Sequence, residues 1–232
     1  MKVTYTTADL IAFEDEIAAL FAEKRIHAPV HLAGGNESQL IRIFEEHVNP
    51  DDWVLCSWRS HYHCLLKGVP PEQLRQAILD GKSISLCFPE HRILSSGIVG
   101  GTAPIAVGLA MGIKRKQSGM VQRAMDDLPI TFGELLNSQR KIVCFLGDMT
   151  AETGIVHESI KYAAGFDLPI LWVIEDNGLS VSTNTEEVWG GRHYYSGTVI
   201  RRNLPVNVES NVVRYRYTLT RPHVGIGTHV AF

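Results

Sequence analysis

Apolar residues recur at helical spacing in the first third of the chain. Between residues 7 and 26 they stand three or four positions apart, which places them on one face of an amphipathic helix. They are Leu10, Phe13, Ile17, Leu20 and Phe21. A second helix is expected over residues 37–48 with Asn36 as its cap, and a third over residues 71–80, which has proline in its first turn and stops at Gly81.

Two nearly continuous apolar runs later in the chain predict buried parallel strands. They are "KIVCFL" (141–146) and "PILWVIE" (169–175), and a helix is expected between them, from about residue 154 to 166. Runs of this kind are typical of strands covered on both faces. We therefore expect an α/β fold of three layers, in which a mostly parallel sheet has helices on both faces.

A stretch rich in small residues precedes the first of these strands. "GGTAPIAVGLAMGIKRK" (100–116) predicts a helix that lets other backbones approach closely and that ends in basic residues. Residues 118–140 are polar and irregular in period, so we expect them to form a surface excursion before the strand.

Composition narrows the class of protein. The chain has 232 residues, of which 45% are hydrophobic and 20% charged, so residues 1–232 are expected to form a single domain. The net charge is −3, and the short basic clusters contain no interleaved aromatic residues, which argues against nucleic-acid binding. The apolar run near residues 103–113 is shorter than the ~20 residues that a membrane span needs.

The N-terminus and the cysteines indicate a compartment. "MKVTYTTADL" has no basic or apolar signal region, and the four cysteines form no CxxC pair. We therefore expect a soluble protein of a reducing cytoplasm.

An acidic residue follows the first predicted strand, and an amide follows the second. Asp148 lies in "GDMTAETG" (147–154) and Asn177 in "DNG" (176–178). The carboxyl ends of parallel strands meet at one sheet edge, so both side chains could reach one hard cation such as magnesium or calcium. The start of the following helix favours an anion, and a cation beside an anion suggests a diphosphate. On the residues alone, an alternative stays open, in which Asp148 caps the helix and "DNG" is an ordinary turn.

Four stretches resemble one known family. "GDMTAETGIVHESIKYAAGFDLPILWVIEDNG" (147–178) resembles the thiamine-diphosphate motif of alpha subunits of 2-oxo acid dehydrogenase complexes, GDG followed about thirty residues later by NN. In addition, "HLAGGNE" (31–37) is similar to the family's HLxxGQE, "WRSHYH" (58–63) to YRxHxH, and "GIVGGTAPIAVG" (97–108) to GIVGAQxPxxxG. These motifs stand in the family's order and cover residues 10–185, apart from 118–140.

The resemblance implies a cofactor site for thiamine diphosphate and Mg²⁺, in the diphosphate-binding half of the family's fold. Magnesium would be held by Asp148, Asn177 and the backbone carbonyl of Leu179. Arg59 and Trp58 would contact the phosphates. The other positions implied to bind the cofactor are Gly147, Met149 and Thr150 near the diphosphate, and Gly97 and the backbone of Val99 near the aminopyrimidine.

Catalytic roles are implied for histidines. His61 and His63 would face the reacting carbon or the substrate carboxylate, where an imidazole that titrates near neutral pH is useful. The family's two histidines in YRYHGHS are replaced here by Thr218 and Thr220, and His223 is the candidate to supply the missing imidazole.

The resemblance also implies an activity and partners. The chain would be the alpha-subunit-like half of a thiamine-diphosphate-dependent 2-oxo acid dehydrogenase or decarboxylase. A beta subunit would supply the pyrimidine-binding half and a glutamate, within a heterotetramer, and the acyl group would pass to a lipoyl carrier protein. The sequence does not identify the 2-oxo acid.

Three alternatives stay open at this stage. The chain could be half of a split transketolase-like enzyme. It could be a non-catalytic scaffold subunit of the same fold, since Met149 stands at the second glycine of GDG and Asp176 at the first asparagine of NN. A zinc site is the third alternative, with Cys56, His61, His63 and Cys64 as its ligands, although their spacing is not the usual paired one.

Overall fold

A computed structural model describes residues 1–125, 140–190, 211–221 and 223. Within these ranges six strands form one sheet in the order β2-β3-β1-β4-β5-β8, and β6 and β7 form a separate hairpin. In the large sheet β2 is antiparallel to β3, and the other neighbours are parallel. The strands are β1 (Trp53–Cys56), β2 (Cys87–Phe88), β3 (Ile93–Ser95), β4 (Ile142–Gly147), β5 (Ile170–Asp176), β6 (Leu179–Ser180), β7 (Thr183–Asn184) and β8 (Val212–Arg216).

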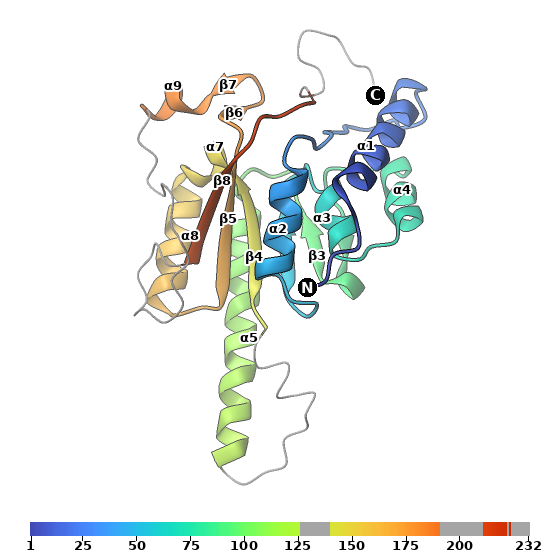
Figure 1. The fold of residues 1–232 in the computed structure, drawn as a ribbon. Helices are drawn as coiled ribbons and strands as arrows, with labels where there is room; N and C mark the ends of the chain where they lie inside the picture. The colour runs from blue at the N-terminus through green and yellow to red at the C-terminus, as the bar shows by residue number, and fades with distance from the viewer. Residues whose placement is uncertain (126–139, 191–210, 222, 224–232) are drawn as a thin grey trace.

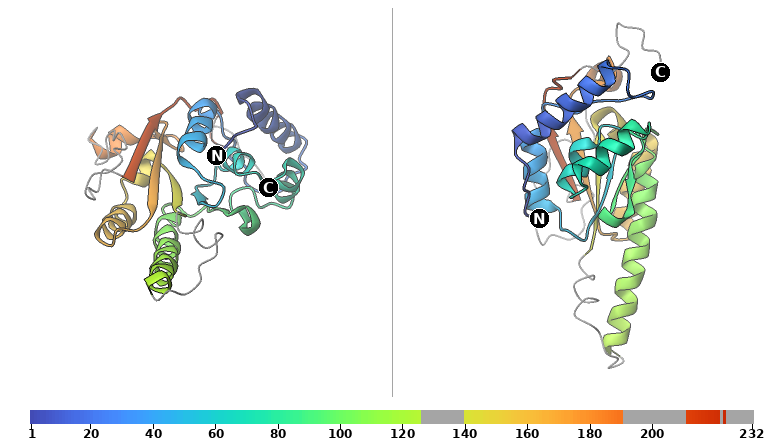
Figure 2. Two further views of the ribbon diagram at one scale, coloured as in Figure 1. Left: turned by 60° about the horizontal axis from the view of Figure 1, so that its bottom comes forward. Right: turned by 90° about the vertical axis from the view of Figure 1, so that its right-hand side faces the viewer.

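Helices cover both faces of this sheet (Figures 1 and 2). One face carries α1 to α4, and the other carries α5 and α8. The helices are α1 (Thr7–Ala22), α2 (Glu37–His47), α3 (His61–Leu66), α4 (Pro71–Leu79), α5 (Thr102–Met125), α7 (Asp148–Ala151), α8 (Gly154–Gly165), α9 (Thr185–Trp189) and the 3-10 turn η1 (Pro89–His91). The predicted three-layer α/β architecture is therefore confirmed.

The central strands are apolar throughout because they separate two hydrophobic cores. Along β4, Val143 and Phe145 pack with the α1–α4 layer, whereas Cys144 and Leu146 pack with the α5–α8 layer. Successive side chains of a strand point to opposite faces, so every side chain of a strand that is covered on both faces points into a hydrophobic core.

Two expectations need correction. The helix expected over residues 100–116 continues to Met125, so residues 118–125, which were expected to begin a surface excursion, are helical. The rest of the expected excursion up to residue 139 lies outside the described residues. Asn36 occupies the position before α2, but its side chain makes no capping hydrogen bond. Its amide instead donates to Glu175 on β5, at 3.2 Å.

Strand register brings the predicted acid and amide to one edge. Gly147 on β4 lies opposite Glu175 on β5, so Asp148 and Asn177 both emerge just beyond the carboxyl ends of adjacent parallel strands. None of the helices in the described part of the chain is long and apolar enough to cross a membrane.

Candidate functional site

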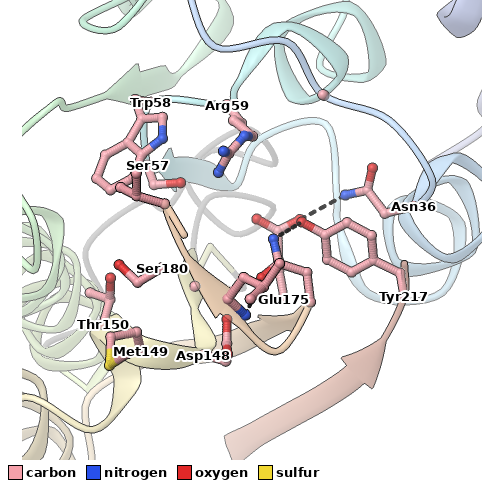
Figure 3. Close-up of a pocket in the computed structure, with 15 residues that line it drawn as sticks. Asn36, Ser57, Trp58, Arg59, Asp148, Met149, Thr150, Glu175, Ser180 and Tyr217 are labelled. Atoms are coloured by element: carbon pink, nitrogen blue, oxygen red, sulfur yellow. Dashed lines mark hydrogen bonds between the residues drawn. The ribbon is translucent and has the colours of Figure 1, made fainter. Parts of the chain in front are cut away.

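A pocket opens at the carboxyl edge of β1, β4 and β5 (Figure 3). Its empty volume is about 590 Å³ including the open mouth. Three segments supply most of its wall: the turn after β1, the turn after β4 and the turn after β5 leading into β6. The lining residues are Ala33, Asn36, Ser57, Trp58, Arg59, Gly147, Asp148, Met149, Thr150, Glu175, Asn177, Leu179, Ser180, Val181 and Tyr217.

Most of the predicted binding residues meet in this pocket although they are distant in the chain. The ones that line it are Trp58, Arg59, Gly147, Asp148, Met149, Thr150, Asn177 and Leu179. All predicted metal ligands are in this group. The pocket thus joins the metal positions to the predicted phosphate contacts on the opposite wall (Figure 3).

Asp148 is the buried acid of the site. It is the first residue of α7, it is 1% exposed, and it accepts a hydrogen bond from the hydroxyl of Thr185. Burial raises the pKa of its carboxyl and the Asp176 charge adds to this, while the Thr185 hydrogen bond acts in the opposite direction. A nearby cation would relieve the cost of keeping this charge buried.

The turn after β5 presents the second and third predicted ligands. The Asn177 side-chain oxygen accepts from the backbone N–H of Leu179 at 2.9 Å, which closes an Asx turn. The Asn177 amide donates to the hydroxyl of Tyr217 at 3.2 Å. Asn177 is therefore held from both ends of its amide group at the pocket wall.

Asp176 is committed to arginines of β8. Its carboxylate accepts from Arg214 Nε at 2.9 Å and from Arg216 Nε at 3.1 Å, and from the backbone N–H of Gly178 at 3.1 Å. Burial alone raises the pKa of Asp176, but the hydrogen bond and charge of Arg214 outweigh it, so this pKa lies below its usual value. The acid at the first NN position thus has a structural partner and does not line the pocket.

The opposite wall carries two buried N–H groups that lack an acceptor within the described part of the chain. Arg59 Nε and Trp58 Nε1 are buried and have no hydrogen-bond partner among the described residues. Burial lowers the pKa of Arg59, while the charges of Tyr217 and Glu175 act in the opposite direction. An anion in the pocket would satisfy both donors, which fits a phosphate group.

Two histidines extend this wall. His223 Nδ1 lies 3.2 Å from an Arg59 guanidinium nitrogen, and its ring stacks on His31 with centroids 4.0 Å apart. Burial, then the neighbouring charges of His223, Arg59 and His61, lowers the pKa of His31 to about 4. Burial and Arg59 also lower the pKa of His223. Both rings therefore favour the neutral form as long as no anion is bound beside them.

His61 and His63 lie behind the pocket and do not line it. His61 is fully buried, with Nδ1 3.0 Å from Glu14 and Nε2 2.9 Å from the Ser83 hydroxyl. His63 is 1% exposed and its Nε2 lies 3.4 Å from Glu175. The structure therefore does not bring these two rings together with the predicted cofactor contacts.

Gly97 and Val99 also lie outside this pocket. They belong to the segment between β3 and α5, where Ile98 is 75% exposed and Val99 53% exposed. A Cβ at Gly97 would lie 3.1 Å from Ile84, so the glycine is used for close packing beneath this exposed segment.

Several pocket residues were missed because their roles arise from distant contacts. Glu175 was assigned to a strand, but its carboxylate accepts from Asn36 and from the Tyr215 hydroxyl and lies at the pocket floor. His31 belongs to a motif that was noted, yet only its stacking with His223 reveals its place. The other lining residues without a predicted site role are Ala33, Asn36, Ser57, Ser180, Val181 and Tyr217.

The zinc alternative is not supported. In the described ranges no group of three or more His, Cys, Asp and Glu side chains is arranged to hold a metal ion. Cys56 and Cys64 are free thiols within a hydrophobic core, where burial raises the pKa of each well above the usual range. His61 is already occupied by Glu14 and Ser83.

Fold and pocket together define an α/β protein that has an acid, an amide, an arginine and an indole donor at the carboxyl edge of parallel strands. Such folds bind ligands at this edge. The sequence of residues 5–211 matches the model of the family described as dehydrogenase E1 component. The chain belongs to this family, and the predicted resemblance is confirmed.

Curated relatives agree with this family. The chain is 29% identical over 189 residues to the alpha subunit of acetoin:2,6-dichlorophenolindophenol oxidoreductase of Bacillus subtilis, covering 77% of this chain and 50% of that protein. The corresponding subunit of Cupriavidus necator is 28% identical over 184 residues, covering 75% and 49%. The chloroplastic pyruvate dehydrogenase E1 component subunit alpha-3 of rice (Oryza sativa subsp. japonica) is 30% identical over 176 residues, covering 71% and 38%. The chain thus spans half the length of these relatives or less.

Proposed function

We propose that this chain is the diphosphate-binding, alpha-subunit-like half of a thiamine-diphosphate-dependent 2-oxo acid dehydrogenase. The observation that carries the proposal is one pocket with a buried carboxylate on one wall, and with the Arg59 Nε and the Trp58 indole N–H, partnerless in the described ranges, on the other. A magnesium diphosphate needs this combination of oxygen ligands and N–H donors. Family membership supports the same cofactor.

In this proposal each wall has a separate task. Asp148, the Asn177 side-chain oxygen and the Leu179 carbonyl hold Mg²⁺, while Arg59 and Trp58 hold the diphosphate oxygens. The Asn177 oxygen already accepts a hydrogen bond from the Leu179 N–H. It would bind the metal either through its second lone pair or in place of this hydrogen bond. Thiamine diphosphate held in this way would supply the carbon nucleophile and the electron sink that decarboxylation of a 2-oxo acid requires.

The histidines divide into two groups. His223, paired with His31 beside Arg59, is the imidazole that we place nearest to the substrate carboxylate or the reacting carbon. His61 and His63 are proposed to act as positioning residues, because both are buried behind the pocket. A direct contact of His61 with substrate would require the ring to leave Glu14 and Ser83. The ring nitrogens of His63 have no hydrogen-bond partner among the described residues, and its Nε2 lies 3.4 Å from Glu175.

The remaining parts of the proposal concern partners. The exposed segment that contains Gly97 and Val99 is proposed to meet the aminopyrimidine where a beta subunit completes the site with its glutamate. A heterotetramer with such a subunit in the cytoplasm and transfer of the acyl group to a lipoyl carrier complete the proposal. Two relatives named above are alpha subunits of an acetoin oxidoreductase, so acetoin is a second candidate substrate.

Substitution of the acid tests the metal assignment. Asp148→Asn keeps the size of the side chain and an oxygen that accepts from Thr185, but removes the charge, so Mg²⁺-dependent affinity for thiamine diphosphate should fall at least about tenfold. Isothermal titration calorimetry measures this affinity. Since the substitution removes a buried charge, the melting temperature should stay the same or rise. The control is Asp167→Asn, which removes an exposed carboxylate remote from the pocket. Equal affinities in the two variants would contradict the assignment.

A further inference from the structure

Met149 is the main departure from the family's motif at the diphosphate end. It stands where GDG has its second glycine, and its side chain is part of the pocket wall. A glycine leaves this space free, whereas a methionine has three rotatable bonds and can reach into the pocket. The direction of this side chain therefore decides whether a diphosphate fits.

The structure shows what fixes the Met149 side chain. The indole Nε1 of Trp189 donates to Met149 Sδ at 3.0 Å. A thioether sulfur is a weak acceptor and the indole N–H is a donor only, so this contact uses the one polar function of each side chain. Trp189 is 43% exposed, so burial alone does little to hold its ring in place.

Local structure places Trp189 above the turn that carries Met149. Trp189 is the last residue of α9, which lies beside α7 at the top of the sheet (Figure 1). The Asn184 side chain caps the start of α9 by accepting from the backbone N–H of Glu186, at 2.8 Å. Gly190, with φ +68°, ends the helix.

A second contact ties α9 to the same turn. The hydroxyl of Thr185, at the start of α9, donates to the carboxylate of Asp148. The two ends of this short helix therefore contact consecutive residues of the β4–α7 turn, Asp148 and Met149. This arrangement fixes the distance between Trp189 and the turn.

We propose that Trp189 is a positioning residue that holds the Met149 side chain out of the path of the diphosphate, so that methionine is tolerated at a position where the family has glycine. The inference rests on the proposed function, since it concerns the same site. If the inference holds, substitutions of Trp189 affect diphosphate binding only while residue 149 is methionine, because a glycine at 149 has no side chain for the indole to position.

A double-mutant cycle with magnesium pyrophosphate as the probe tests this inference, because the probe needs only the diphosphate end of the site. Affinities are measured by isothermal titration calorimetry on the full chain with Met or Gly at 149, each combined with Trp, Phe or Ala at 189. Trp189→Phe keeps an aromatic ring and removes the N–H donor. Val188→Ala, a substitution of an exposed residue beside Trp189, is the matched control.

The expected result is a conditional loss. Trp189→Phe and Trp189→Ala should weaken pyrophosphate binding roughly three- to tenfold when Met149 is present, in line with the net strength of the one hydrogen bond that both variants lose. In the Met149→Gly background the same changes should leave the affinity unchanged, and Val188→Ala should have no effect in either background. A structural role of Trp189 alone would give the same loss in both backgrounds.

The opposing outcomes separate this inference from the proposed function. Equal losses with Met and Gly at 149, or no loss with Phe at 189, would overturn the role of Trp189 and leave the diphosphate site intact. Binding by Met149→Gly but not by the native chain would also overturn it, because the indole would then fail to clear the site. Absence of binding in both backgrounds would overturn the proposed function, and this inference with it.

Discussion

At the scale of the residue, the pocket concentrates unsatisfied groups. A carboxylate that is 1% exposed, an arginine whose Nε has no partner and a histidine whose pKa is lowered to about 4 all occur within or beside one cavity. Each of these groups is costly without a ligand of opposite character. Clustered perturbation of this kind is typical of functional sites.

His31 yields a prediction about acid stability. Its pKa is lower in the folded protein than in the unfolded chain, so the unfolded chain binds more protons between about pH 6.5 and pH 4 and the free energy of unfolding falls as the pH drops through this window. In His31→Gln the loss between pH 7 and pH 5 should be smaller by roughly 1 kcal/mol, a value discounted because the ring is partly open to water. Urea unfolding at the two pH values measures the difference. His91→Gln is the control, and an identical pH dependence in native protein and His31→Gln would contradict the argument.

At the scale of the element, the segment after β8 closes over the loop before α2. The backbone N–H of Thr220 donates to the Gly34 carbonyl at 3.3 Å. A Cβ at Gly35, where φ is +94°, would lie 1.9 Å from the Thr218 carbonyl oxygen. The two segments can touch because residue 35 has no side chain, and this contact places His31 and His223 side by side.

Two glycines allow a matched test of this contact. Gly35 and Gly68 have nearly the same positive φ, +94° and +92°, but a Cβ at Gly68 would meet nothing within 4 Å. Gly68→Ala should cost only the left-handed backbone penalty of about 1–2 kcal/mol. Gly35→Ala should cost at least about 2 kcal/mol more and weaken pyrophosphate binding, because the 217–220 segment must move. Denaturant unfolding gives both values, and equal costs would show that the close approach does not matter.

Sequence patterns were sufficient where one segment determines its own structure. The apolar runs predicted β4 and β5, and their order placed Asp148 and Asn177 at one edge. The periodicity does not predict the extension of α5 to Met125, because this part of the helix projects beyond the sheet and does not need the apolar face that packing on the sheet requires (Figure 1). The roles of Glu175 and His31 were not predictable because their partners lie far away in the chain.

At the scale of the whole molecule, the proposed site combines an enclosed pocket with an exposed segment. The diphosphate end is a closed pocket wall, whereas the segment proposed to meet the aminopyrimidine is exposed, with Ile98 75% and Val99 53% accessible. Exposed apolar residues beside a binding site are typical of a surface that another protein covers. Under the proposed function, the groups that this chain does not supply would lie on a partner subunit.

Native mass spectrometry with thiamine diphosphate and Mg²⁺, with and without a chelator, tests the central claim most directly. The measurement is made on the purified chain and on its complex with a beta-type subunit. The account predicts a mass increment of one cofactor and one Mg²⁺ per site that disappears when the chelator is added. A spectrum without a chelator-sensitive increment, both for the chain alone and for the complex, would contradict it.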